Sequence, residues 1–378
     1  MSYTSGLRIS ILLLFYGFGM WTCSRSPHSS NIRSLDQAKV LRKWSLPLDS
    51  LPGIAGMYLI SELNTEDLSI VVECFDPPSK KRHHYLLTLT DKIGLARLTS
   101  KPIDSYSCFF PNSNRYIHIQ PSGDLLLIGN TETTGYDSLR TSNEYYFSFG
   151  LKPLIMNGRI FQQTVDASFE LRDRRQNKLF FEHTKALAII DSSLKIERFV
   201  GAYPPDYIDK GVYAYHLSPY LAGSNGIIYM SFPGSSFVGW FDPFKDNTVF
   251  SKFFSEFEVD YKPMDTASFM HISKAMQFQD TVSHYTSVGH NGSYGKTARI
   301  YYRHKPIEFN GELFNGSIIV GDLETGQVDV EFLISSKYYK QTRMILSNMG
   351  LLMIEYSQNS EEKTMINFTL RNIYDHQL

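Results

Sequence analysis

The sequence predicts an all-β fold, a six-bladed β-propeller closed by an N-terminal strand. Aromatic residues make up 14% of the 378 residues, with 24 Tyr and 26 Phe, and such residues favour strands over helices. Short apolar or alternating runs recur along most of the chain, each bounded by turn residues. Their spacing suits repeated sheets of four strands, the usual blade of a propeller.

The strongest apolar runs define six units. They begin at residues 68, 123, 178, 226, 297 and 350 and read LSIVVECF, GDLLLIGN, KLFFEH, GIIYMSF, TARIYYR and GLLMIEY. Alternating segments at 115–120, 213–218 and 342–347 precede three of these runs, and we expect them to be the innermost strands of their units. A β-sandwich with a second domain is the structural alternative.

The ends of the propeller domain, predicted at 38–378, should meet. KVLRKWSL (39–46) reads as a strand without a partner nearby in sequence, and it could complete the last blade beside INFTLRNI (366–373). Such pairing would remove an open sheet edge, which invites aggregation. Phe269, Ile272 and Met276 have helical spacing and predict a short helical insertion near 264–278.

Residues 1–22 have the pattern of a lipoprotein-type signal peptide. Arg8 is the only charged residue before position 25, and an apolar run follows at 9–21. Thirteen helical residues span about 20 Å, short of the roughly 30 Å hydrocarbon core, so a transmembrane helix fits poorly. An uncleaved anchor and a buried N-terminal helix are the alternatives.

Cys23 closes this apolar run and resembles the modified cysteine of bacterial lipoproteins. Met20 suits that motif, whereas Trp21 and Thr22 depart from its usual small residues. The resemblance implies cleavage before Cys23, a diacylglycerol on its sulfur, acylation of its amine and attachment to the membrane. Residues 23–37 then read as a flexible tether. Acidic residues do not follow the cysteine, which favours an outer-membrane lipoprotein that faces the periplasm.

Two segments carry a further resemblance, IIDSSLKIERFVGAYP (189–204) and HLSPYLAGSNGIIYMSFPGSSFVGWFD (216–242). Together with the lipoprotein-like start and the six units, they resemble a family of uncharacterised Bacteroidota lipoproteins with a predicted six-bladed β-propeller fold. The resemblance covers most of the chain. It implies a fold and a location, and it assigns no catalytic residue.

Several function classes receive no support. The net charge is −1, from 37 Lys plus Arg and 38 Asp plus Glu, so nucleic acid is not an expected partner. GHNGSYGKT (289–297) lacks the first glycine of a phosphate loop and predicts a hairpin turn. The histidines at 271, 284, 290 and 304 lack the short spacing of metal ligands. We therefore predict no metal, no cofactor and no catalytic residue.

Candidate ligand-binding residues come from the expected position of the innermost strands, which face a central channel. We expect His118, Tyr213, Tyr215, His216 and His284 near its axis. Tyrosine and histidine could stack on a sugar or peptide and hydrogen-bond it. Aromatic packing between blades is the alternative.

Cys74 and Cys108 could form a disulfide in an oxidising periplasm or remain as buried thiols. Together, these sequence features predict a lipid-anchored binding or interaction module whose ligand is an envelope protein, a peptide or a glycan. The alternative is a carbohydrate-active or other hydrolytic enzyme with carboxylates contributed by several blades.

Overall fold

The structure is a computed structural model that describes residues 31–47, 56–64, 68–76, 81–99, 108–109, 115–120, 123–130, 136–142, 144–148, 151, 153–169, 174–210, 217–245, 247–258, 274, 277–278, 281–339, 342–358 and 364–375. In parts of these ranges, such as β3 (Gly56–Asn64), only the backbone is described. The predicted signal peptide and Cys23 lie outside the described residues.

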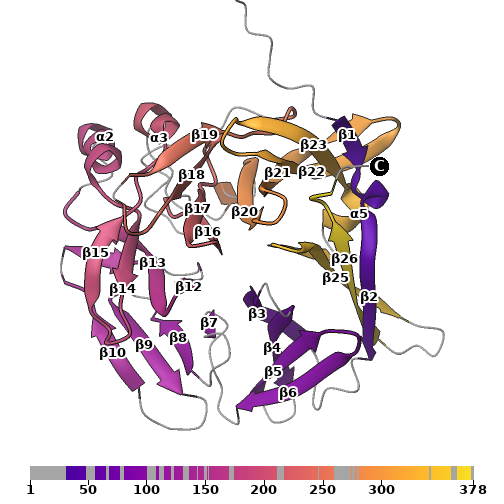
Figure 1. Ribbon diagram of the computed structural model, residues 1–378, viewed down its shortest axis with the longest axis horizontal. Coiled ribbons are helices and arrows are strands. Elements are labelled where there is room, and N and C mark those ends of the chain that lie inside the picture. Colours follow the sequence, from indigo (N-terminus) through magenta and orange to yellow (C-terminus); the bar gives the residue numbers. More distant parts are fainter. Residues whose placement is uncertain are drawn as a thin grey trace, which may run out of the picture.

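Hydrogen bonding groups the described strands into six sheets, which are arranged in a ring (Figure 1). Five of the sheets contain four strands that are consecutive along the chain and antiparallel to their neighbours. These sets are β3, β4 (Ser69–Asp76), β5 (Lys81–Leu89) and β6 (Ile93–Thr99); β7 (Cys108–Phe109), β8 (Arg115–Ile119), β9 (Leu125–Asn130) and β10 (Tyr136–Arg140); β12 (Leu154–Met156), β13 (Arg159–Asp166), β14 (Leu187–Ile190) and β15 (Ile196–Val200); β16 (Tyr220–Ser224), β17 (Ile227–Ser231), β18 (Phe237–Phe241) and β19 (Val249–Lys252); and β20 (His284–Asn291), β21 (Lys296–Phe309), β22 (Glu312–Asp322) and β23 (Gln327–Ser335). β11 (Tyr145–Phe147) also pairs with β13.

The sixth sheet is assembled from both ends of the chain. It contains β24 (Thr342–Ser347), β25 (Gly350–Gln358), β26 (Thr364–Asn372) and β2 (Lys39–Pro47), in the order β2-β26-β25-β24. β2 pairs with β26 as the sequence suggested, with Trp44 opposite Phe368. The fold is thus an all-β propeller with five blades, each built from consecutive strands. The sequence had instead predicted six such units.

The first strands of these sheets lie next to one another around the ring. β12 contacts β16, β16 contacts β20, and β20 contacts β24. β24 contacts β3, which contacts β7. The innermost position predicted for 342–347 is therefore confirmed by β24, whereas 115–120 forms β8, the second strand of its sheet.

The apolar cores lie between neighbouring sheets. Phe161 of β13 and Met230 of β17 belong to one core, and Trp44 of β2 and Leu87 of β5 belong to another. Alternate residues of a strand point to opposite faces, so a strand covered on both sides has apolar residues throughout. β14 illustrates this rule, since all four of its residues are buried.

The prediction of a strand at 178–183 is wrong. These residues end a helix, α2 (Arg174–His183), which packs beside α3 (Pro205–Lys210). Consecutive strand residues would face opposite sides, but Phe180 and Phe181 both enter one core, as helix residues next to each other can. The second strand of this sheet is β13. Gln162 and Gln163 interrupt its apolar residues, so it could not be recognised as an apolar run in the sequence.

Residues 31–37 were expected to belong to the flexible tether, and this boundary is also wrong. They form β1 (Asn31–Ser34) and the 3-10 turn η1 (Leu35–Gln37). β1 runs parallel to β23, with Ser34 opposite Leu333, and Leu35 is fully buried. Burial of Leu35 and strand pairing explain the order of this segment.

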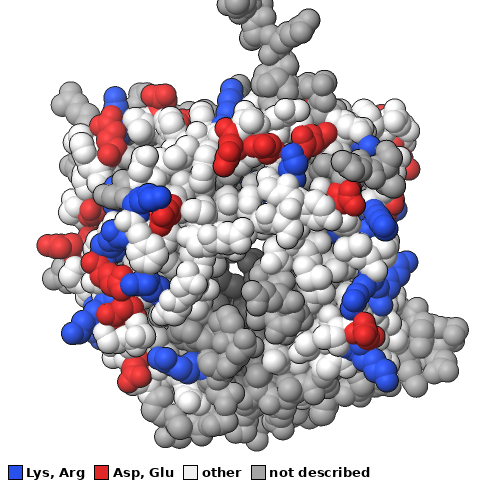
Figure 2. Space-filling model, viewed as in Figure 1, with Lys and Arg blue, Asp and Glu red and all other residues white. Residues whose placement is uncertain are grey.

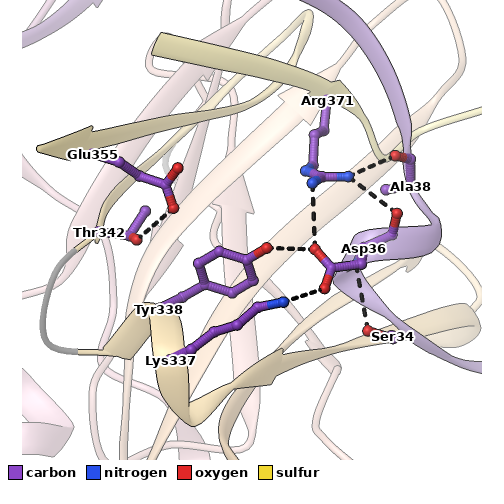
Figure 3. Close-up of polar contacts among 8 residues, drawn as sticks. All are labelled: Ser34, Asp36, Ala38, Lys337, Tyr338, Thr342, Glu355 and Arg371. Carbon is purple, nitrogen blue, oxygen red and sulfur yellow. Dashed lines mark hydrogen bonds and ion pairs between the residues drawn. The ribbon is translucent and has the colours of Figure 1, made fainter. Parts of the chain in front are cut away.

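An ionic cluster that we call the N-terminal clasp fastens this segment (Figure 3). The Asp36 carboxylate accepts hydrogen bonds from Lys337 Nζ at 2.6 Å and from the hydroxyl of Tyr338, both on α5 (Ser336–Tyr339). It also pairs with Arg371 Nη2 of β26 at 3.4 Å. Arg371 Nη1 in addition donates to the carbonyl of Ala38 at 2.9 Å. The clasp therefore joins the N-terminal segment to two neighbouring sheets.

β2 in turn contacts the first sheet. Trp44 Nε1 donates to the carbonyl of Thr90 at 2.6 Å, in the turn between β5 and β6. Arg42 forms an ion pair with Asp91 of the same turn at 3.1 Å. The segment from β1 to β2 therefore connects three consecutive sheets of the ring.

The helical insertion predicted at 264–278 lies almost entirely outside the described residues. Lys274, Gln277 and Phe278 are described, and each is helical. Phe278 packs against the core that also contains Phe161.

Candidate functional site

His284 lies on β20, the first strand of its sheet. Its ring is partly buried, and its Nδ1 lies 3.1 Å from the carbonyl oxygen of Val282. The ring centroid is 6.3 Å from that of Tyr302 on the next strand. These contacts hold the imidazole against its own sheet.

The structure does not bring His118 to an innermost strand. It lies on β8, opposite Leu127, and is partly buried. The innermost place belongs to β7, which has two residues and is too short to be recognised from a pattern. Tyr213, Tyr215 and His216 lie outside the described residues, as do Met264 to His271 of the insertion.

A group of hairpin turns that the sequence analysis did not single out lies at one end of the innermost strands. Each turn joins the first and second strands of its sheet. We call these four turns the turn rim; they are residues 157–158, 225–226, 292–295 and 348–349. The signal was an asparagine in or just before each turn, at Asn157, Asn225, Asn291 and Asn348.

Two of these turns are Asn-Gly pairs in which both residues have positive φ. The φ angles are 52° and 73° at Asn157 and Gly158, and 51° and 78° at Asn225 and Gly226. Such turns match the twist of the flanking strands and set their register tightly. These two turns therefore have a well-defined backbone conformation.

Contacts between neighbouring sheets show that the four turns lie side by side. A Cβ at Gly223 would lie 3.0 Å from Met156 Sδ, which places β16 against the end of β12. A Cβ at Gly292 would collide with the side-chain amide of Asn225. The amide of Asn291 donates to the carbonyl of Asn348. The chain of contacts runs through four consecutive sheets.

The turn rim contains no charged residue. The strands that lead into it, β12, β16, β20 and β24, contain one formal charge, Arg343. Burial lowers the pKa of His290 on β20, which keeps this ring neutral near pH 7. In the face shown in Figure 2, the described surface around the central opening is uncharged, and charged side chains lie toward the outer edge.

The turn rim nevertheless exposes two large side chains. Tyr294 is 51% exposed and Met349 is 38% exposed. The Asn291 side chain is occupied, because its Oδ1 accepts from the backbone amides of Ser293 and Tyr294 at 2.9 and 3.0 Å. Asn348 Oδ1 is buried and accepts no hydrogen bond from the described residues.

His290 serves packing. Its ring stacks on Tyr229 of β17, with centroids 4.4 Å apart and planes 12° apart, and its Nδ1 lies 3.0 Å from Thr297 Oγ1. Burial, followed by the charge of Glu324, raises the pKa of Tyr229 to about 12. The segment 289–297 is a hairpin between β20 and β21, as predicted.

A concentration of buried polar groups lies between the sheets of β16–β19 and β20–β23. Arg299 is fully buried; its guanidinium donates to Ser231 Oγ at 2.7 Å and lies 3.4 Å from the ring centroid of Tyr285. It also donates to the carbonyls of Phe232, Ser235 and Phe253, at 2.8, 2.8 and 3.1 Å. Burial lowers the pKa of Arg299 to about 10, so it stays charged at neutral pH.

Carboxylates surround this cluster and bind protein groups. Asp206 accepts from Ser235 Oγ at 2.6 Å and from the amide of Ser236 at 3.0 Å. Glu258 accepts from Ser236 Oγ at 2.7 Å and from the Tyr285 hydroxyl at 2.9 Å. These hydrogen bonds fix the loops between two sheets, which is a bracing role.

A third carboxylate, Glu331 of β23, is fully buried. Ser255 Oγ and the amide of Glu256 donate to its two oxygens. Burial raises the pKa of this carboxyl, although the hydrogen bonds from Ser255 and Ser317 oppose the rise. Among the residues that the structure describes, no three His, Cys, Asp or Glu side chains are grouped so that they could hold a metal ion.

No protein-family model matches the sequence, and no curated protein matches it. Within the described part of the chain, no helix has the length and apolarity needed to cross a bilayer.

Two solved structures share the fold. A member of the DUF4221 family from Bacteroides vulgatus is 14% identical, with a TM-score of 0.57; the match covers 89% of this chain and 98% of that one. A Bacteroides fragilis protein, provisionally described as exported, is 13% identical, with a TM-score of 0.51; the match covers 90% of this chain and 98% of that one. At such identities the likeness concerns the fold, and this chain has the β-propeller fold of these two Bacteroides proteins.

Proposed function

We propose that this protein is a lipid-anchored envelope protein that binds a partner or ligand at the mouth of a closed six-bladed propeller and performs no catalysis. The observation that carries the proposal is the turn rim, to which four consecutive sheets contribute. Binding surfaces of propellers commonly gather loops from several blades around the central opening. The turn rim exposes Tyr294 and Met349, and its turns are short, so binding would require little ordering of the protein.

The sixth blade in this proposal is the sheet of β24, β25, β26 and β2. Contacts from β24 to β3 and from Trp44 to Thr90 support it, because they connect this sheet to the first one. With β2 as its outermost strand, this sheet would join both ends of the chain and close the ring. The N-terminal clasp strengthens the same junction.

The anchor in this proposal is a lipid on Cys23, with the propeller on the periplasmic side of the outer membrane. β1 begins at Asn31, so the tether would be residues 24–30. Seven extended residues reach at most about 25 Å. Such a tether would keep the sheets that contact β1 and β2 near the membrane surface. The provisional description of the Bacteroides fragilis protein as exported agrees with an envelope location.

The anchor is tested with Cys23→Ala in cells fed a labelled fatty acid. We expect label on the wild-type protein and none on the variant. Equal labelling of both proteins would refute lipidation at Cys23.

The binding function is tested by affinity purification of the intact lipoprotein from its own cells, followed by mass spectrometry of bound proteins and glycans. Tyr294→Ala should lose a ligand that the wild type retains. Tyr136→Ala is the matched control, because Tyr136 is 56% exposed on β10, the outermost strand of its sheet. Turnover of glycans by the purified protein, without a ligand that depends on Tyr294, would support a hydrolytic enzyme in place of a binding module.

A further inference from the structure

We infer that the turn rim recognises a neutral saccharide. The inference rests on the proposed binding function and names the chemical class of its ligand. The groups that carry it are the half-exposed residue Tyr294 and the side-chain amides of Asn225 and Asn348, together with the absence of charge in all four turns.

Charge excludes several other ligand classes. A phosphate, a sulfated glycan or a nucleic acid is normally held by Arg, Lys or helix N-termini, and the turn rim contains neither basic residues nor a helix. The nearest lysine in sequence, Lys296, is paired with Asp329 at 2.7 Å. The nearest arginine after the first turn, Arg159, is paired with Glu197 at 3.0 Å. Neither basic side chain is left as a free counterion for an anionic ligand.

The polar groups of the turn rim suit hydroxyl-rich ligands. A side-chain amide has both donors and an acceptor and can bind two neighbouring hydroxyls of a sugar. Asn348 Oδ1 is buried and has no hydrogen bond with the described residues, so this amide has an unused acceptor. Asn225 lies against Gly292 of the next sheet, so its amide is held at the junction of two turns.

Tyr294 supplies the apolar part of the site. Half of this residue is exposed although it lies in a turn whose backbone is fixed by Asn291. An exposed tyrosine can offer the flat face of its ring to the C–H groups of a pyranose, and its hydroxyl can hydrogen-bond the sugar's edge. Met349 of the neighbouring turn adds an exposed, adaptable apolar side chain.

An extended peptide fits these turns less well. Peptides that add to a sheet need a free strand edge with unpaired amides and carbonyls, whereas the turn rim presents the ends of hairpins. Its residues are mainly Asn, Ser, Gly and Tyr, a set that binds through side-chain hydrogen bonds and aromatic contact. A protein partner remains one outcome of the test.

The test applies the intact, detergent-solubilised lipoprotein to an array of neutral hexose and N-acetylhexosamine oligosaccharides beside uronic-acid and sulfated ones. We expect binding of neutral oligosaccharides that is retained between low and high salt, since no ion pair is involved. Tyr294→Ala should weaken the best neutral ligand by about 5- to 10-fold, and Tyr136→Ala by less than about twofold. Thermal unfolding of both variants should match the wild type.

The other results separate the two levels of the proposal. Binding confined to anionic oligosaccharides, or neutral binding that Tyr294→Ala leaves unchanged, would overturn the saccharide inference. So would a protein or peptide partner that co-purifies with the wild type and is lost in Tyr294→Ala, although that result would preserve the binding function. If no ligand of any class depends on Tyr294, both the saccharide inference and the binding site fail.

Discussion

Replacing Asp36 with alanine should loosen the N-terminal clasp and lower the free energy of unfolding by about 1 to 2 kcal/mol. The substitution removes the one carboxylate that Lys337, Tyr338 and Arg371 share. It leaves the backbone intact, including the carbonyls of Asp36 and Ala38 that accept from Arg371. The effect therefore reports the side-chain cluster and not the strand pairing of β1.

The magnitude follows from the exposure of each partner. The Lys337 side chain is 59% exposed and that of Asp36 is 41% exposed, so solvent screens this ion pair and it contributes less than about 1 kcal/mol. The Tyr338 hydrogen bond to a charged acceptor adds about 1 kcal/mol. Arg371, 12% exposed, adds little at 3.4 Å, and it keeps its bond to Ala38 when Asp36 is removed.

The assay is urea unfolding of wild type, Asp36→Ala and a control, Asp91→Ala. Asp91 is 95% exposed and pairs with Arg42, which is 49% exposed, so the control should cost less than about 0.5 kcal/mol. Hydrogen exchange should show faster exchange of the β1 amides in Asp36→Ala and unchanged exchange in β25. Equal losses of stability in the two variants would contradict the clasp.

The pH dependence provides a second check. Burial alone would raise the pKa of Asp36, but the hydrogen bonds from Lys337 and Tyr338, together with the charges of Lys337 and Arg371, outweigh it and lower the pKa below the ordinary 3.8. A carboxyl with a lowered pKa stabilises the fold above its ordinary pKa and loses this contribution as the pH falls through the folded value. The difference between wild type and Asp36→Ala should therefore be constant near neutrality and shrink in acid. A constant difference down to pH 2 would falsify the electrostatic account.

Three other substitutions address the interior. Arg299→Met should cost more than about 3 kcal/mol, because it leaves one hydroxyl and three carbonyls buried without their donor; a loss below about 1 kcal/mol in urea unfolding would refute the bracing role. Glu331→Gln should gain stability relative to wild type as the pH rises above the ordinary value of 4.5, because a carboxyl whose pKa is raised by burial loses its contribution with rising pH; a pH-independent difference would contradict the burial effect. Gly321→Ala should cost about 2 kcal/mol or more, because the new Cβ would collide with the carbonyl oxygen of Gln327 and lie 2.8 Å from the Val328 Cα; unchanged thermal unfolding would show that the strands shift freely.

Local patterns were sufficient for much of the fold. Alternation and apolar runs predicted most second strands, and the glycine-rich segment 289–297 was recognised as a hairpin turn. The pairing of 39–46 with 366–373 could be suggested because an unpaired strand at each end needs a partner. The same patterns failed at 178–183, where an apolar run belongs to a helix whose adjacent phenylalanines share one core.

The candidate site was less predictable from the sequence. His284 lies on the first strand of its sheet, whereas His118 lies on a second strand because the two-residue β7 precedes it. The asparagine turns were visible as isolated pairs, but their proximity depends on four sheets packing side by side. No sequence spacing reveals that adjacency.

Sequence pattern is enough to specify the all-β class, the hairpin turns and the absence of charge in the segments that form the turn rim. Those properties depend on neighbouring residues, since side-chain alternation and turn geometry are local. Packing of the sheets decided the rest: the order of residues 31–37, the meeting of Asp36 with Lys337, and the burial of Arg299 between two sheets. Asp36 and Lys337 are 301 positions apart, and the pairing of β1 with β23 brings the N-terminal segment within hydrogen-bonding distance of α5.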